Sequence, residues 1–167
     1  MTRSNLPTLG GCHSGNSLHT DREFEHFASL IKRAALGISD DLAYDPSYPL
    51  QIDSMWAIIN APGSHDSAHI HPGALWSSVY YLHTPEDCGE IEFVNPRISN
   101  VMNAAKFDSD RRRPVECWTS VKFTPSAGQL SIFPSWLYHS VHPSFSKLAG
   151  RDGERVILSF NLSQAVR

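Results

Sequence analysis

A succession of short β-rich segments, separated by turn residues, most constrains how this chain of 167 residues can fold. The pieces between the segments carry Pro, Gly, Asn or Ser, which favour turns. About eight short strands with turns at regular spacing are typical of a sandwich or jelly roll. The predicted strands cover residues 52–60, 68–71, 75–82, 90–94, 117–124, 129–133, 138–141 and 155–162. We therefore predict an all-β core over residues 51–162.

The residues before this core predict an irregular arm and one helix. Residues 1–19 are rich in Gly, Ser, Asn and Thr, which indicates an irregular arm. Residues 20–37 repeat apolar side chains at helical spacing. Thr20 and Glu23 match a capping box at the start, and Gly37 is a typical C-terminal stop. At this length we expect the whole chain, residues 1–167, to form a single domain.

Charge and cysteine content limit the partners of such a domain. The net charge is −3, so no global field attracts nucleic acid. No apolar run approaches the roughly 20 residues of a membrane span, and no signal peptide is visible. Three cysteines without metal-binding spacing fit a reducing compartment. We expect a soluble cytoplasmic protein with no nucleic-acid or membrane partner, and we leave open a homodimer.

Three histidines stand out from the nine in the chain. His69 and His71 are two residues apart, so on a β-strand both side chains point to the same face. His139 follows in a later predicted strand. Three ligands on one face of a metal ion leave the other positions open for substrate and oxygen. We therefore predict a metal site made of His69, His71 and His139.

Carboxylates near these histidines leave the ligand set open. A non-haem iron site usually has a His-x-Asp/Glu pair plus a distant histidine. Here His71 occupies the acidic position, so either three histidines bind the metal or Asp66 or His65 replaces His71. We favour three histidines, because Asp66 is expected in a loop. Glu90 and Glu92 are further alternatives, although their segment has the pattern of an ordinary strand.

The spacing of the glycines and histidines resembles that of cupin-type β-barrels. Gly63, His69 and His71 match the start of the first cupin motif, and Gly128, Pro134 and His139 match much of the second. The glutamate that usually follows the His-x-His pair is missing, and Trp136 replaces the inner glycine of the second motif. The sequence thus resembles a cupin-like jelly roll whose metal site is not an ordinary cupin site.

Longer motifs resemble a small bacterial and phage family of 2-oxoglutarate- and iron(II)-dependent oxygenases. The motifs are HIHPGALWSSVYYL, VNPR, PSAGQLSIFPSWLYHSVHP and ERVILSFN, and the resemblance runs from about Met55 to Leu162. It implies a double-stranded β-helix with iron on His69, His71 and His139. It also implies a 2-oxoglutarate co-substrate whose distal carboxylate binds Arg155, with contacts from Tyr81 and Asn60.

Two features of the sequence depart from this family pattern. His71 replaces the usual acidic ligand, so the ligands leave an extra positive charge on the site. The segment between His139 and Arg155 is longer than usual, so Lys147 or Arg151 on that segment is the fallback anchor for 2-oxoglutarate. Trp76, Tyr80, Trp136 and Tyr138 are candidate pocket walls.

The function predicted from the sequence is therefore oxygenation, most concretely hydroxylation of an unidentified substrate, with 2-oxoglutarate and O₂ as partners. One alternative is a cupin-type metalloenzyme with three histidines and no 2-oxoglutarate, which has no need of Arg155. The other alternative is a catalytically silent barrel that serves binding or regulation.

Overall fold

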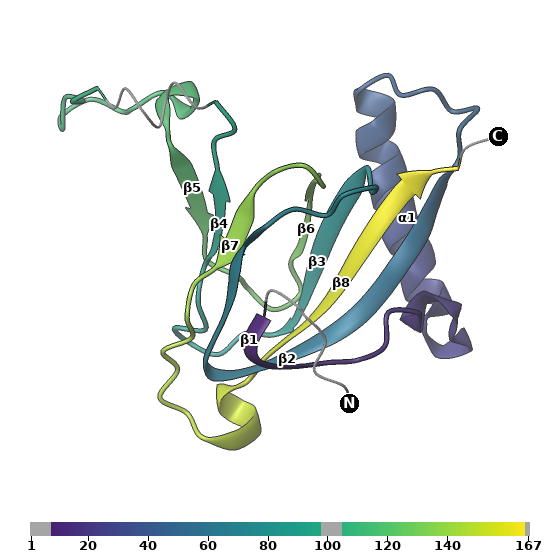
Figure 1. The fold of residues 1–167 in the computed structure, drawn as a ribbon, viewed down its shortest axis with the longest axis horizontal. Coiled ribbons are helices and arrows are strands. Elements are labelled where there is room, and N and C mark those ends of the chain that lie inside the picture. The colour runs from purple at the N-terminus through teal and green to yellow at the C-terminus, as the bar shows by residue number, and fades with distance from the viewer. Residues whose placement is uncertain (1–7, 98–104, 166–167) are drawn as a thin grey trace.

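The computed structural model describes residues 8–97 and 105–165. Figure 1 shows a strongly curled sheet with one long helix beside it. The strands pair antiparallel in the order β5-β4-β7-β2-β8-β3-β6, and β1 pairs with β2. They are β1 (Thr8–His13), β2 (Leu50–His69), β3 (Trp76–His83), β4 (Ile91–Val94), β5 (Ser120–Phe123), β6 (Leu130–Pro134), β7 (His139–Val141) and β8 (Arg155–Gln164). The predicted all-β, jelly-roll core is confirmed.

Strand β2 is one long strand where the sequence indicated two strands and a turn. Its first half, from Leu50 to Asn60, pairs with β8, and its far end pairs with β7 through Asp66 and His69. The register shifts between these last two residues, and Gly63 adopts a φ of +88° where the strand passes from one partner to the other. The expected turn does not form because neighbouring segments, including Ser144, bind the backbone there. Strand β2 therefore joins the two sides of the curled sheet.

The helical region differs from the predicted range at both ends. Two short 3₁₀ turns, Leu18–Thr20 and Arg22–Phe24, come before α1 (Glu25–Asp41). Thr20 donates its hydroxyl hydrogen to the Ser17 carbonyl and does not cap the helix. Gly37 lies inside α1 and does not end it. An exposed glycine costs a helix only about 1 kcal/mol, and packing beyond it offsets that cost.

One contact shows how this packing extends the helix. The indole nitrogen of Trp76 donates to the hydroxyl of Ser39 at 3.0 Å, two residues beyond Gly37. The arm also differs from the prediction, because its residues 8–13 form β1 on the edge of β2. Both corrections arise from contacts with distant parts of the chain, which local sequence patterns do not contain.

The two faces of the sheet carry separate hydrophobic clusters. On the outer face, α1 packs its buried Ile31 and Ala35 against β2, β3 and β8. The strand residues of this cluster are Leu50, Met55, Trp76, Leu158, Phe160 and Leu162. The inner cluster comprises Ile58, Val79, Tyr81, Ile91, Phe133 and Ile157. Within the described ranges, no helix is long and apolar enough to cross a membrane.

Candidate metal centre

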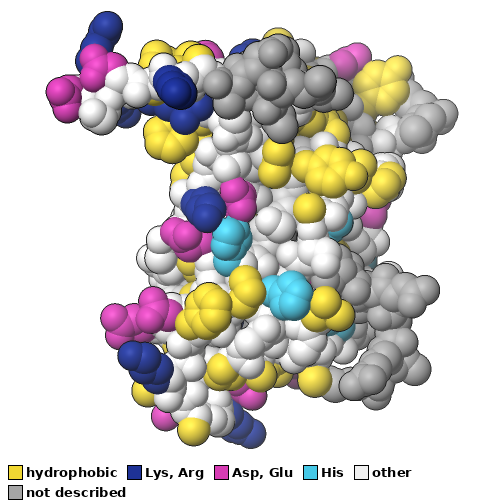
Figure 2. Space-filling view, turned by 60° about the vertical axis from the view of Figure 1, so that its left-hand side comes forward, with side chains coloured by type: hydrophobic (Ala, Val, Ile, Leu, Met, Phe, Trp, Pro, Cys, Tyr) yellow, Lys and Arg dark blue, Asp and Glu magenta, His cyan; other side chains and the backbone are white. Residues whose placement is uncertain are grey.

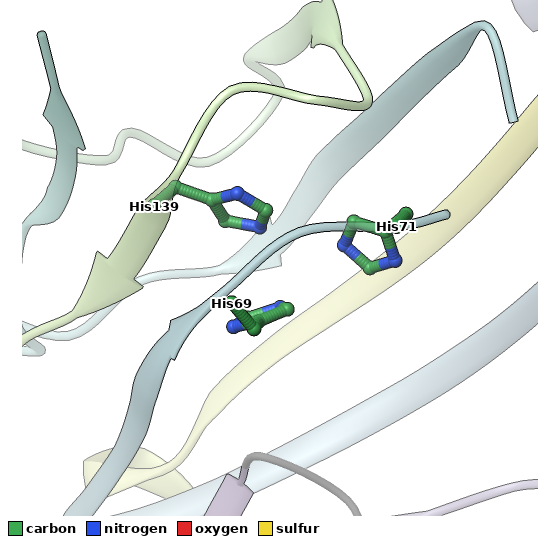
Figure 3. Close-up of side chains that lie close together, drawn as sticks. All are labelled: His69, His71 and His139. Carbon is green, nitrogen blue, oxygen red and sulfur yellow. The ribbon is translucent and has the colours of Figure 1, made fainter. Parts of the chain in front are cut away.

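Three imidazoles converge inside the curled sheet. Figure 3 shows His69, His71 and His139 with their rings turned toward one another. Their ring centroids are 4.3 Å apart for His69 and His139, 5.0 Å for His69 and His71, and 5.2 Å for His71 and His139. One nitrogen from each ring lies within 4.8 Å of the others. The structure thus brings the three predicted ligands together, and this is the one such cluster among the described residues.

Hydrogen bonds orient two of these rings. Nδ1 of His139 lies 2.9 Å from the Leu137 carbonyl, and Nδ1 of His69 lies 2.7 Å from the Ser67 carbonyl. A carbonyl oxygen only accepts hydrogen bonds, so both Nδ1 atoms carry the proton. The Nε2 atoms are therefore left with free electron pairs. This arrangement is the one by which backbone carbonyls fix the tautomer of metal-binding histidines.

His71 was predicted to reach the cluster from the face of a strand, but it does so from beyond the end of one. Strand β2 ends at His69, so His71 lies just beyond the strand and not on its face. The His71 amide donates to the Ser135 carbonyl at 2.9 Å, which anchors the segment to the turn between β6 and β7. Its ring lies 6.2 Å from that of Trp56. Tertiary contacts, in addition to strand alternation, therefore place this imidazole.

Burial keeps two of the three imidazoles neutral. Burial lowers the pKa of His71 to about 4, and the adjacent His139 and His69 lower it as well. Burial also lowers the pKa of His139 to about 4, although the Leu137 carbonyl acts in the opposite direction. A metal ion binds the neutral form of imidazole. His71 and His139 can therefore bind a cation near neutral pH without first losing protons.

The alternative acidic ligands lie outside the cluster. Glu92 accepts a hydrogen bond from His142 at 2.6 Å, and Glu90 accepts one from Thr124 at 3.2 Å. The hydrogen bonds from Ser120 and then His142 lower the pKa of Glu92. Neither His65 nor Asp66 belongs to the group of converging ligand atoms. Asp66 was expected in a loop, but it lies in β2 and is buried.

The histidines face a cavity of about 550 Å³ enclosed by the inner face of the sheet. Its walls come from β2, β3 and β8, from Ile91, Phe133 and Val141 of neighbouring strands, and from residues 13–16 of the arm. Hydroxyl and amide groups line part of it through Ser54, Ser77, Ser159 and Asn161. A cavity of this size next to converging polar groups is typical of a small-molecule site.

Arg155 is the most unusual residue of this cavity. It is the first residue of β8, only 1% exposed, and it lines the cavity with the three histidines. Nη1 donates to the Cys88 carbonyl at 2.7 Å and to the Gly89 carbonyl at 3.3 Å. Nε and Nη2 are buried without a partner. A buried guanidinium with unused donors can bind an anion, because leaving it unpaired is costly.

The turn that holds Arg155 depends on Gly89. This residue has a φ of +88°, a region that residues with a side chain rarely adopt. A Cβ atom here would lie 2.1 Å from the His142 carbonyl oxygen. The glycine therefore allows the backbone to pass close to the strand that carries His139 and to offer carbonyls to the guanidinium.

Tyr81 and Asn60 are both buried near Arg155, but only Tyr81 lines the cavity. Tyr81 is buried and lines the cavity. Burial raises its pKa to about 12, against the effect of the Arg155 guanidinium, so the phenol keeps its proton and can donate it to a carboxylate. Asn60 pairs with Arg155 in register and is fully buried with its amide nitrogen and oxygen unpartnered. It is not part of the cavity wall, so its contact with a co-substrate stays a prediction.

Several other predicted residues lie elsewhere. Lys147 and Arg151 are exposed and outside the cavity wall. Trp136 and Tyr138 are 59% and 52% exposed, while Trp76 and Tyr80 belong to the outer cluster, so none of the four lines the cavity. Figure 2 shows hydrophobic side chains in small separate groups over the visible part of one face. None of the four candidates is therefore a pocket wall, and Trp76 and Tyr80 are core residues instead.

The residues that do line the cavity include some that the sequence reasoning missed. Strand alternation counted from Arg155 leads to Ile157, Ser159 and Asn161 on the same face. The same alternation counted back from Asn60 leads to Ile58, Trp56 and Ser54. Ser77 donates to Asn161 at 2.9 Å, and Asn161 donates to Ser54 at 3.3 Å, so a polar chain crosses three strands. The strand alternation that places these residues in the cavity was present in the sequence. No sequence pattern indicated that His13 of the arm lines the cavity as well.

Comparisons with known proteins place the chain in a family. A family model described as "Putative 2OG-Fe(II) oxygenase" matches residues 54–161, which include all three histidines and Arg155. The match covers well over half of the chain, so the chain belongs to this family. Iron(II) and 2-oxoglutarate are the metal and co-substrate that define it. No curated protein matches the sequence significantly.

Solved structures support the same fold at low sequence identity. A Pseudomonas putida prolyl-4-hydroxylase is 16% identical, with a TM-score of 0.62, and the match covers 93% of this chain and 73% of that one. A Trichoplax adhaerens prolyl hydroxylase, solved with a hypoxia inducible factor fragment, is 18% identical, with a TM-score of 0.60 and coverages of 96% and 66%. HygX from Streptomyces hygroscopicus, with nickel and 2-oxoglutarate bound, is 14% identical, with a TM-score of 0.57 and coverages of 96% and 74%.

These similarities identify the fold as a double-stranded β-helix, as predicted. The chain spans as little as 55% of the length of a structure that it matches.

Proposed function

We propose that this protein is a non-haem iron(II) oxygenase that uses 2-oxoglutarate and O₂ to hydroxylate a substrate. The observation that carries the proposal is Arg155, a buried guanidinium with two unpartnered nitrogens in the same cavity as three converging imidazoles. An enzyme that needs only a metal has no use for such a group. A co-substrate with a carboxylate at each end requires both a metal and a distant cation.

The donor set fits iron. His69, His71 and His139 would hold the ion through ring nitrogens, and imidazole is a ligand that suits iron. Three protein ligands leave coordination positions for the co-substrate and oxygen. Backbone carbonyls of Leu137 and Ser67 hold two of the rings in the tautomer that binding requires.

The opposite group of donors fits the distal carboxylate of 2-oxoglutarate. Arg155 offers Nε and Nη2, and Tyr81 offers a protonated hydroxyl nearby. Asn60 lies beside Arg155 and would add its amide. Charge-assisted bonds of this kind are shorter and about twice as strong as neutral ones.

When bound, iron(II) with 2-oxoglutarate supplies the oxidising chemistry, in which the co-substrate yields succinate and carbon dioxide and one oxygen atom enters the substrate. The protein orients the co-substrate between Arg155 and the imidazoles. The apolar walls formed by Ile58, Val79 and Ile157 exclude water from the cavity. The polar chain of Ser54, Asn161 and Ser77 is available to a neutral hydrogen-bonding group of the substrate.

The test is an anaerobic titration of the iron-loaded protein with 2-oxoglutarate, followed by its absorption band. We expect a band in the wild type and a ten- to a hundredfold weaker affinity in Arg155→Ala, because a bond to a charged group contributes about 1.5–3 kcal/mol. Arg151→Ala serves as the control, because Arg151 is exposed and outside the cavity. An unchanged affinity in Arg155→Ala would exclude this anchor.

The same titration separates the two alternatives. Iron binding without any 2-oxoglutarate band in the wild type would favour a three-histidine metalloenzyme of the cupin type. Failure to bind iron at all would favour a silent barrel. The family membership is the reason that neither alternative is preferred.

A further inference from the structure

Asp66 is a buried acid without a partner. It lies in β2, three residues before His69, and is 6% exposed. Its Oδ1 has no hydrogen-bond partner among the described residues, and its carboxylate forms no ion pair with any of their basic side chains. Burying a charge without compensation is expensive. An unpaired carboxylate in this position therefore requires a positive charge that comes from elsewhere.

The position of Asp66 indicates where that charge is. Asp66 lines the same cavity as the three histidines and Arg155. It pairs with Val141 of β7, two residues beyond His139. Asp66 therefore lies beside the metal centre, although its oxygens are not among the converging ligand atoms.

A count of charges shows a deficit that Asp66 would remove. In a site with two histidines and one carboxylate, the ligands carry one negative charge. Three neutral histidines carry none, so a bound divalent cation keeps its full charge. Arg155 adds one positive charge, and the 2-oxoglutarate dianion removes two. One positive charge is left in a cavity shielded from water, and Asp66 supplies one negative charge.

We propose that Asp66 is the charge-compensating carboxylate of this metal centre and acts without binding the metal. It takes over the electrostatic role of the acidic ligand that His71 replaces. This inference rests on the proposed function for the identity of the ligands, but its test uses the metal alone. It predicts that Asp66 strengthens metal binding and destabilises the metal-free protein.

The first experiment measures Mn²⁺ binding to the metal-free protein by calorimetry, without 2-oxoglutarate. We expect Asp66→Asn to raise the Kd by roughly ten- to a hundredfold, the range typical of residues just outside a ligand set. Asp53→Asn is the matched control, because Asp53 is an exposed aspartate on the same strand. A Kd within twofold of the wild type would overturn the inference. The same result is expected if Asp66 binds a cationic substrate and does not act on the metal.

The second experiment moves the charge from one position to the other. The double variant Asp66→Asn, His71→Asp places a carboxylate in the ligand set and removes the one outside it. We expect its Mn²⁺ affinity to recover most of the loss seen in Asp66→Asn. A further loss, with no recovery, would mean that Asp66 acts through local structure and not through its charge.

Unfolding by urea gives a readout that is independent of the metal. We expect the midpoint of metal-free Asp66→Asn to lie above that of the wild type, because the variant no longer buries an unpaired charge. A lower midpoint would show that another group already compensates the carboxylate and would contradict the inference. If the wild type gave no 2-oxoglutarate band but these results held, the proposed function would fail and the role of Asp66 would stand.

Discussion

The two faces of the sheet formed by β2, β3 and β8 carry different kinds of residue, although they belong to the same strands. The face against α1 holds Met55, Trp76 and Leu162, which are buried and apolar. The cavity face holds Arg155, Asn161 and Ser77, which carry hydrogen-bonding or charged groups. Both faces bury apolar clusters that stabilise the fold, but the inner face also presents polar and charged groups to the cavity. The division indicates that stability and binding can be changed separately in this fold.

A substitution on the outer face should have the largest effect on stability. Leu162 is fully buried between the strands and α1 and does not line the cavity. We expect Leu162→Ala to lower the free energy of unfolding by about 2–5 kcal/mol, because it removes apolar contacts and leaves a cavity. Urea unfolding measures this, and Mn²⁺ affinity of the folded fraction should match the wild type. A large loss of affinity with little loss of stability would contradict the division.

The reciprocal substitution is His139→Ala on the inner face. It removes one of three imidazoles, and we expect Mn²⁺ and iron(II) affinity to fall by more than roughly a hundredfold, beyond the range for residues just outside a ligand set. Circular dichroism should show that the fold survives, because Phe133 and Phe93 still pack beside the site. Full metal occupancy in the folded variant would remove His139 from the ligand set.

Acid should affect the inner face through the pKa values of His71 and His139, each lowered to about 4. The unfolded chain binds protons near pH 6.5, while the folded protein binds them only near pH 4. Stability of the metal-free protein is therefore full above pH 6.5 and falls as the pH decreases toward 4. Between pH 7 and pH 5 we expect a loss of about 1 kcal/mol for His71, about half the unscreened value because its ring is partly exposed, and of about 2 kcal/mol for the buried His139.

The measurement is urea unfolding of the metal-free protein at pH 7, 6 and 5. His71→Gln should reduce the pH dependence, because glutamine takes up no proton in this range. Leu162→Ala is the control, since it should lower stability at every pH without changing the slope. An equal slope in His71→Gln and in the wild type would show that this imidazole does not cause the effect.

The sequence predicted the strands more accurately than the boundaries of the helix. Runs of β-rich residues between turn residues located β3, β4, β6, β7 and β8 to within a few residues. The capping signals at Thr20 and Gly37 were wrong, because packing of Ser39 against Trp76 continues α1 past the glycine. The turn predicted near Gly63 was wrong too, because β2 finds hydrogen-bond partners on both sides of it.

By itself, the sequence determined the alternation that forms the sheet, the family, and the three histidines and one arginine around which the site is built. The strands and the His69-x-His71 pair follow from local sequence patterns, whereas the family, and with it the role predicted for Arg155, follows from the resemblance of longer motifs. The tertiary structure decided that His71 reaches the site from beyond a strand, that Arg155 is buried with unused donors, and that Asp66 lies in the cavity without a partner. The burial of a side chain and the hydrogen-bond partners that it finds depend on which distant segments of the chain lie next to it. The curl of the sheet sets them, and no local pattern contains it.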